Sequence, residues 1–283
     1  MNGIPILSML TIAMNWWMAP ASPPVFHATN ILLHALNGVL VYLLARRLLR
    51  LGKKSDEDSL PLSEPMAMLA GFLIALHPLA TESVNLVIGR TALLSATFAI
   101  GAVLLMLRAT DREEGFGVGT LVGAGACFAM SWACDITALF VPGFMLIADW
   151  IANGAAMRRR LAVHAAFWAI AIALGAWWMT VTKLDANPYD VMQESPATPS
   201  GVEALAFSRG LGLSMNFTPL TIEHDLPPAS GYIDLEEPGV NPFLAVTTGA
   251  GLGLVALILI LVRSPAGLGL AWFLLALLPV AFF

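Results

Sequence analysis

Apolar residues run through this chain in long blocks separated by short polar stretches. Most blocks approach the roughly 20 residues that a helix needs to cross a bilayer, and none alternates like a membrane β-strand. We expect helices near residues 4–19, 27–49, 66–86, 91–107, 118–134, 136–151, 161–182, 242–262 and 267–283. The pattern predicts an all-α, polytopic transmembrane helical bundle of about eight spans. It forms a single domain, 1–283, in which residues 1–25 are an outer juxtamembrane segment.

The composition strengthens the membrane prediction. Hydrophobic residues make up 58% of the 283 positions and charged residues 12%, and the mean hydropathy is +0.79. Soluble domains carry about 25% charged residues. Cys127 and Cys134 lie seven positions apart in an apolar run without metal-ligand companions, so we expect packing residues and neither a disulfide framework nor a zinc site. Membrane lipid is the expected partner, and nucleic acid is not.

The basic residues fall in clusters that set the orientation. These clusters are Arg46, Arg47, Arg50, Lys53 and Lys54; Arg108 and Arg112; Arg158, Arg159 and Arg160; and Arg263. Lys and Arg concentrate in cytoplasmic loops. Suppose that the 27–49 helix crosses the membrane from outside to inside and that each later span crosses in the opposite direction to the one before. Every cluster then lies on the cytoplasmic side, and only Arg90, Lys183 and Arg209 lie on the outer side. We therefore expect an integral membrane protein, of the bacterial inner membrane, with cytoplasmic basic loops.

Three further features follow from this topology. The stretch 118–151 is read as a hairpin with Asp135 at its outer turn, because a single span would expose the triple arginine. A long, acidic, proline-rich outer loop covers 183–240, and 203–222 within it is predicted to be a helix at the membrane interface. The predicted outer span ends carry Trp16, Trp17, Trp177 and Trp178, as in an aromatic belt.

Polar residues interrupt the apolar stretch ALHPLATESVNLVIGRTALL at 75–94. His77 and Pro78 are predicted to end one helix, and Glu82 and Arg90 are eight positions apart, so they could share a helical face. Two interpretations remain open. Arg90 reaches lipid headgroups from a salt-bridged turn, or it holds a phosphate that Glu82 orients, since the arginine fork suits anionic oxygens.

Other polar residues have simpler interpretations. One stripe of the 27–49 helix carries Phe26, His27, Asn30, His34 and Asn37. Hydrogen bonding between helices is favoured over a ligand role for this stripe. His224 and Asp225, beside Glu223, are candidates for an acceptor or metal site, but adjacent loop residues rarely suffice, and no metal is expected.

Several segments together resemble one family. FHATNILLHALNGVLVYLLARRLL is followed by ALHPLATESVNLVIGRTALLSATF, then by LTIEHDLP at 220–227 and GLAWFLLALLPV at 269–280. This order is similar to the membrane O-mannosyltransferase-like proteins with tetratricopeptide repeats, in the glycosyltransferase C superfamily. The matching positions are Phe26, His27, Asn30, His34, His77, Pro78, Thr81, Glu82, Val84, Gly89 and Arg90.

The resemblance implies a glycosyltransferase C-like bundle and sugar transfer from a polyprenyl-phosphate donor on the outer side. Arg90, Glu82 and His77 would then lie at the donor phosphate. The family's catalytic aspartate lies upstream of a segment like the one beginning at Ile4, and Cys134-Asp135 stands where the family often has Lys-Glu. We therefore expect a chain that is not catalytically competent by itself, with no assigned catalytic residue. The alternative is a non-catalytic accessory or scaffold subunit that packs against other membrane subunits.

Overall fold

A computed structural model describes residues 6–20, 22–51, 60–77, 80–110, 117–185 and 242–272. Every regular element among these residues is a helix, in agreement with the predicted all-α class. The elements in chain order are α1 (Ile6–Met18), α2 (Pro23–Leu51), α3 (Leu60–Leu76), α4 (Ala80–Asn85), α5 (Arg90–Ala109), α6 (Val118–Trp132), η2 (Ile136–Phe140), α7 (Val141–Asn153), η3 (Gly154–Arg160), α8 (Leu161–Asp185) and α10 (Pro242–Leu261).

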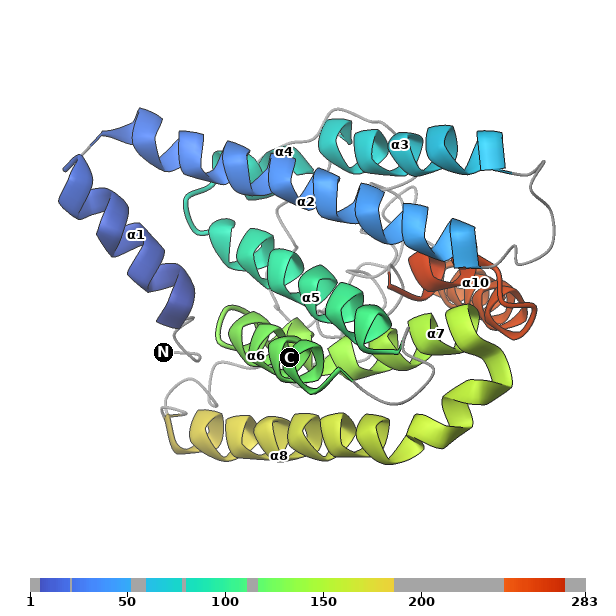
Figure 1. Cartoon of the computed structure of the whole chain (residues 1–283). Coiled ribbons are helices and arrows are strands. Elements are labelled where there is room, and N and C mark those ends of the chain that lie inside the picture. The colour runs from blue at the N-terminus through green and yellow to red at the C-terminus, as the bar shows by residue number, and fades with distance from the viewer. Residues whose placement is uncertain are drawn as a thin grey trace.

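Helix α5 forms the centre of the bundle. It lies between α2 on one side and α6 and α7 on the other, and α8 packs beyond them (Figure 1). Val103, Met106 and Leu107 of α5 are fully buried, and they join Met145 and Ile151 of α7 in one apolar core. Because lipid is as apolar as these side chains, close packing and polar contacts between helices hold such a bundle together.

Helices α2 and α3 approach each other through small residues. A Cβ atom added to Gly71 would lie 2.8 Å from the carbonyl oxygen of Gly38, and one added to Gly38 would lie 3.3 Å from the Cβ of Ala75. Small residues of this kind let two helix backbones come close inside a membrane. The α2 and α3 pair is therefore closely packed by its backbones.

The predicted count of about eight spans is not confirmed. Three stretches of described helix are long and apolar enough to cross a membrane: Pro23–Arg50, Arg90–Ala109 and Ile136–Thr180. Four shorter apolar helices are Ile6–Met18, Ser63–Leu76, Val118–Trp132 and Ala250–Leu261. The segment predicted at 66–86 is in fact two helices, because the chain leaves α3 after Leu76, as His77 and Pro78 predicted.

The stretch 118–151 is a hairpin, as predicted. Helix α6 ends at Trp132, and the Asp135 carboxylate accepts the backbone N–H of Thr137 (2.8 Å) at the start of η2. The chain reverses again through η3, because His164 at the start of α8 bonds to Asp149 of α7. Near the other end of α8, Trp177 packs on Trp132 with ring centroids 5.5 Å apart.

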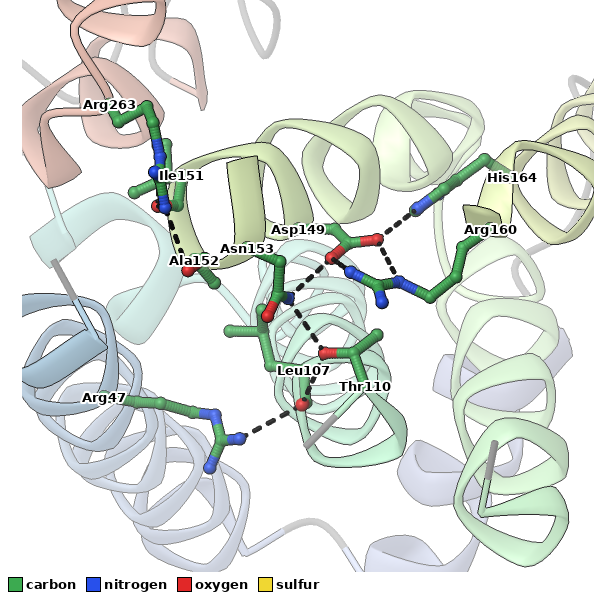
Figure 2. A network of polar contacts seen from close by, with 10 residues as sticks. All are labelled: Arg47, Leu107, Thr110, Asp149, Ile151, Ala152, Asn153, Arg160, His164 and Arg263. Carbon is green, nitrogen blue, oxygen red and sulfur yellow. Dashed lines mark hydrogen bonds and ion pairs between the residues drawn. The ribbon is translucent and has the colours of Figure 1, made fainter. Parts of the chain in front are cut away.

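The described members of the predicted basic clusters gather at one end of the bundle. Arg47 of α2 donates to the carbonyl of Leu107 in α5 (3.0 Å), and Arg160 contacts Asp149 in α7 (Figure 2). Arg108 follows Leu107 on α5, and Arg263 lies against the end of α7. The predicted topology places all of these groups on the same side. Their assignment to the cytoplasm remains a prediction.

Arg263 ends α10 in an unusual way for a non-glycine residue. Its φ is 59°, in the left-handed region. The Ser264 N–H donates to the Leu259 carbonyl (2.8 Å), and the Arg263 N–H donates to the Ile260 carbonyl (3.0 Å). This pair of bonds is a Schellman motif, in which glycine usually occupies the left-handed position. The Arg263 guanidinium in turn donates to the carbonyls of Ile151 (2.9 Å) and Ala152 (3.0 Å), so it caps α7.

Helix α1 lies across the opposite end of the bundle. Leu7 N–H donates to the carbonyl of Ala133 beyond α6 (3.4 Å), and the Asn15 amide bonds to Thr29 Oγ1 near the start of α2 (2.7 Å). Trp16 and Trp17 at its end are 57% and 84% exposed. These exposed indoles lie where the predicted outer interface would be.

Cysteine labelling tests the orientation. We expect an Asn85→Cys variant to react with a membrane-impermeant maleimide from outside, and Ala156→Cys to react only after the membrane is opened. Both positions are exposed, at opposite ends of the bundle, in a background with Cys127→Ala and Cys134→Ala. The reverse pattern would show that the basic end faces outward, which would contradict the orientation predicted from the distribution of Lys and Arg.

Candidate functional site

The candidate site lies at the turn between α4 and α5, at the end of the bundle away from the basic clusters. Helix α4 ends at Asn85, and α5 begins at Arg90. Glu82 and Arg90 therefore do not lie on one continuous helix, and the predicted shared helical face is wrong. The cause is a tight turn at Leu86 to Gly89, where a Cβ on Gly89 would lie 2.6 Å from the carbonyl oxygen of Ser83.

Arg90 begins α5 with its side chain fully buried. Its Nε donates to Asn30 Oδ1 (2.8 Å), and its Nη2 donates to the backbone carbonyl of Phe26 (3.1 Å). The guanidinium also lies 6.0 Å from the centroid of the Phe26 ring, within range of a cation–π contact. Arg90 points into the protein, so the interpretation in which it reaches lipid headgroups does not fit this geometry.

Asn30 of α2 holds the turn in place. Its amide nitrogen donates to the carbonyls of Val84 (3.2 Å) and Leu86 (2.9 Å), while its oxygen accepts the Arg90 bond. The last carbonyls of a helix have no partner within the helix, and Asn30 is fully buried. Its amide therefore supplies the hydrogen bonds that water would otherwise give to these two carbonyls. One side chain thus fixes both the turn and the orientation of the arginine.

One nitrogen of the guanidinium remains available. Arg90 Nη1 is buried without a hydrogen-bond partner, and no carboxylate whose side chain is described pairs with Arg90. A buried cation without a counter-charge is costly, and an anionic oxygen at Nη1 would lower that cost. Arg90 Nη1 therefore retains unused hydrogen-bonding capacity at this turn. The side chain of Glu82 lies outside the described structure.

The rest of the α2 stripe bonds to neighbouring helices. His34 Nε2 lies 3.2 Å from the carbonyl of Ala75 in α3. The Asn37 amide donates to the carbonyl of Leu93 (3.0 Å) and accepts from Thr97 Oγ1 (2.8 Å), both in α5. His27 is half-buried near the start of α2, and His77 lies directly after α3. The described contacts of Asn30, His34 and Asn37 thus join α2 to α3, α4 and α5.

A second polar cluster, which the sequence reading missed, lies at the basic end. Asp149 of α7 is fully buried and accepts from Arg160 Nη2 (2.6 Å) and Nε (3.0 Å). His164 Nε2 lies 2.9 Å from Asp149 Oδ2. Asn153 donates to Asp149 Oδ1 (2.7 Å) and to Thr110 Oγ1 at the C-terminal end of α5 (3.2 Å) (Figure 2). The cluster therefore joins α5, α7, η3 and α8.

The sequence does contain a signal for this cluster. Asp149 is a carboxylate inside an apolar block, where an ionisable residue is a candidate for function or for a buried pair. Arg160 and His164 follow eleven and fifteen positions later, beyond the turn that the triple arginine marks. The two-pronged contact with Arg160 and the bond to Asn153 point to a structural role in joining helices.

Some predicted site residues lie outside the described structure. His224 and Asp225, like the predicted interfacial helix at 203–222, fall in this category. Among the described residues, no group of three His, Cys, Asp or Glu side chains is arranged to hold a metal ion. The expectation that residues 223–225 hold no metal therefore stays a prediction, because these residues lie outside the described structure.

Comparison with known proteins gives similarities over about half of the chain. "Protein O-mannosyl-transferase TMTC3" of Mus musculus is 27% identical over 149 residues, which are 52% of this chain and 15% of that protein. "Protein O-mannosyl-transferase TMTC4" of Homo sapiens is 36% identical over 154 residues, 52% of this chain and 21% of that protein. "Protein O-mannosyl-transferase Tmtc3" of Drosophila melanogaster is 29% identical over 159 residues, which are 50% of this chain and 17% of that protein.

The chain thus spans only 15% to 21% of the length of these three relatives. No protein-family model and no solved structure matches it. The similarity supports the predicted resemblance to membrane O-mannosyltransferases. Together with the apolar helices, it supports an integral membrane protein of glycosyltransferase-like character.

Proposed function

We propose that this chain is the membrane-embedded part of a glycosyltransferase related to the O-mannosyltransferases, and that its donor is a polyprenyl-phosphate sugar. In this proposal the donor phosphate binds at the turn between α4 and α5, where Arg90 supplies the positive charge, with Glu82 and His77 nearby in sequence. The observation that carries the proposal is the buried Arg90 Nη1, which has no described partner.

The geometry of Arg90 suits a fixed anion. Its Nε and Nη2 are already bound to α2, so the guanidinium is oriented before a ligand arrives. An oriented arginine loses less side-chain entropy on binding than a mobile one. Its position at the first residue of α5 adds the favourable field of the helix N-terminus for a negative group.

We further propose that the 283-residue chain transfers no sugar by itself. Transfer to a hydroxyl group usually needs a positioned base, which contributes about 100- to 10,000-fold in rate. Among carboxylates with described side chains, Glu64 and Asp149 lie at the basic end, far along the helices from Arg90. Asp135 lies at the other end, but it accepts the N–H of Thr137.

Two measurements on the purified full chain separate donor binding from transfer. Polyprenyl-phosphate mannose is expected to bind, and Arg90→Gln should weaken binding by about tenfold or more, as expected for the loss of a charge-assisted hydrogen bond. Arg159→Gln, an exposed arginine on η3 at the basic end, should leave donor affinity unchanged. Thermal unfolding of each variant checks that it folds, and Arg90→Lys, which keeps the charge, should retain part of the affinity.

The transfer assay adds a serine- and threonine-rich acceptor peptide. No turnover is expected, whereas turnover that disappears in Glu82→Gln would make Glu82 the base and end the proposal of an incompetent chain. An accessory subunit is the second candidate, favoured by the use of two Arg90 nitrogens in holding α2 to α5. Stable co-purification of other membrane subunits, with no donor binding, would favour that second function.

A further inference from the structure

A groove opens between α2 and α5 near the basic end of the bundle. It encloses about 510 Å³. Four arginines line it, Arg46, Arg47 and Arg50 from α2 and Arg108 from α5. Because α5 is 20 residues long, its two ends are about 30 Å apart, and the groove is distinct from the turn at Arg90.

The described side chains balance only part of the charge of Arg46, Arg50 and Arg108. Arg46 and Arg50 each lie 3.0 Å from the Glu64 carboxylate of α3, which also accepts the Tyr42 hydroxyl. Arg108 is exposed, and its guanidinium forms no hydrogen bond or ion pair with the described residues. Among the described side chains, Arg46 and Arg50 therefore share one carboxylate and Arg108 has none, so the groove attracts an anion.

The rest of the lining is apolar. Leu40 and Leu43 of α2 face Leu104 and Leu105 of α5 along the groove, and Leu43 is 36% exposed. A free inorganic anion would contact the arginines and leave these leucines unused. A ligand with an anionic head and a hydrocarbon tail uses both parts, because the arginine forks suit phosphate oxygens and the leucines suit methylene groups.

The position of the groove also fits a membrane lipid. Helices α2 and α5 both belong to stretches that are long and apolar enough to cross a bilayer, and Arg50 and Arg108 occur in the last turns of these helices. Basic residues at span ends lie at the depth of lipid headgroups. An anionic headgroup would thus meet the arginines while its acyl chain continues toward the bilayer centre along the leucines.

We propose that this groove binds one anionic glycerophospholipid. Its phosphate contacts Arg50 and Arg108 at the membrane surface, and one acyl chain lies along Leu40, Leu43 and Leu104. Nothing in this proposal depends on sugar transfer. The ligand class is a two-chain phosphodiester lipid of the bilayer that surrounds the protein.

Native mass spectrometry of the full chain in neutral detergent tests the proposal, with phosphatidylglycerol as the probe. Phosphatidylglycerol should bind as one retained molecule, and phosphatidylcholine at least tenfold more weakly. Arg108→Gln should lower phosphatidylglycerol affinity about fivefold, the fold-change that corresponds to about 1 kcal/mol per basic residue. Arg159→Gln, which changes an arginine that is also exposed but lies on η3 outside the groove, should have no effect.

A second variant probes the apolar part. Leu43→Trp fills the groove without changing its charge, so it should also weaken phosphatidylglycerol binding. Equal losses in Arg108→Gln and Arg159→Gln, or equal binding of both lipids, would overturn the proposal in favour of general surface attraction. Displacement of the lipid by millimolar inorganic phosphate would reduce the site to a simple anion site. Absence of phosphatidylglycerol binding would also refute the proposal.

Discussion

Replacing Asp149 with alanine is expected to destabilise the bundle by about 3 to 5 kcal/mol, the range found when one partner of a buried ion pair is removed. Asp149 is fully buried and accepts from Arg160, Asn153 and His164. Without the carboxylate, Arg160 keeps a largely buried positive charge with no described counter-ion, since its side chain is 14% exposed. The loss should separate α8 and η3 from α7.

Equilibrium unfolding in detergent measures this effect. Asp135→Ala is the matched control, because the same substitution there removes a helix cap on a half-buried residue and should cost about 1 kcal/mol. Combining Asp149→Ala with Arg160→Ala should recover part of the loss, because the double variant leaves no unpaired guanidinium at this place. Equal costs for Asp149→Ala and Asp135→Ala would contradict the assigned role of the cluster.

A Gly89→Ala substitution is expected to cost about 2 to 3 kcal/mol, at the upper end of the range for overpacking. The added Cβ would lie 2.6 Å from the carbonyl oxygen of Ser83 and 2.7 Å from its Cα. Both are backbone atoms of α4, so relief requires the whole turn to open. Because Arg90 is the next residue, the opening should also disturb its bonds to Asn30 and Phe26.

Gly101 provides the control on the same helix. A Cβ there would meet only the Cys127 sulfur, at an ordinary 3.6 Å. Gly101→Ala should therefore raise the free energy of unfolding by about 0.5 to 1 kcal/mol, because alanine restricts the unfolded chain and favours a helix interior. If both alanine variants shifted stability in the same direction, the close approach at Gly89 would be unimportant.

The sequence predicted the all-α class correctly because lipid imposes a simple rule on composition. Apolar blocks predicted the helices, and the predicted division of 118–151 into two helices agrees with α6 and α7. His77 and Pro78 correctly marked the end of α3 at Leu76. These features depend on local chemistry or on charge asymmetry, which a single sequence displays directly.

The internal geometry of the sites depends on partners that are distant along the chain. Spacing alone suggested that Glu82 and Arg90 lie on one helix face, yet a turn required by the contact of Gly89 with Ser83 separates them. Asp149 and Arg160 meet only because η3 reverses the chain between α7 and α8. Such reversals follow from packing of whole helices, which periodicity does not reveal.

The cap on α7 has a consequence for the order of synthesis. The carbonyl of Ile151 receives its hydrogen bonds from Arg263, 112 positions later in the chain. A nascent chain that has inserted α7 but not yet α10 therefore leaves this helix end to water or headgroups. Only when the ribosome has passed position 263 can the carbonyls of α7 acquire their final partner. The last turn of α7 is thus expected to fray during biogenesis and to become rigid late, after the segments between the two helices have been made.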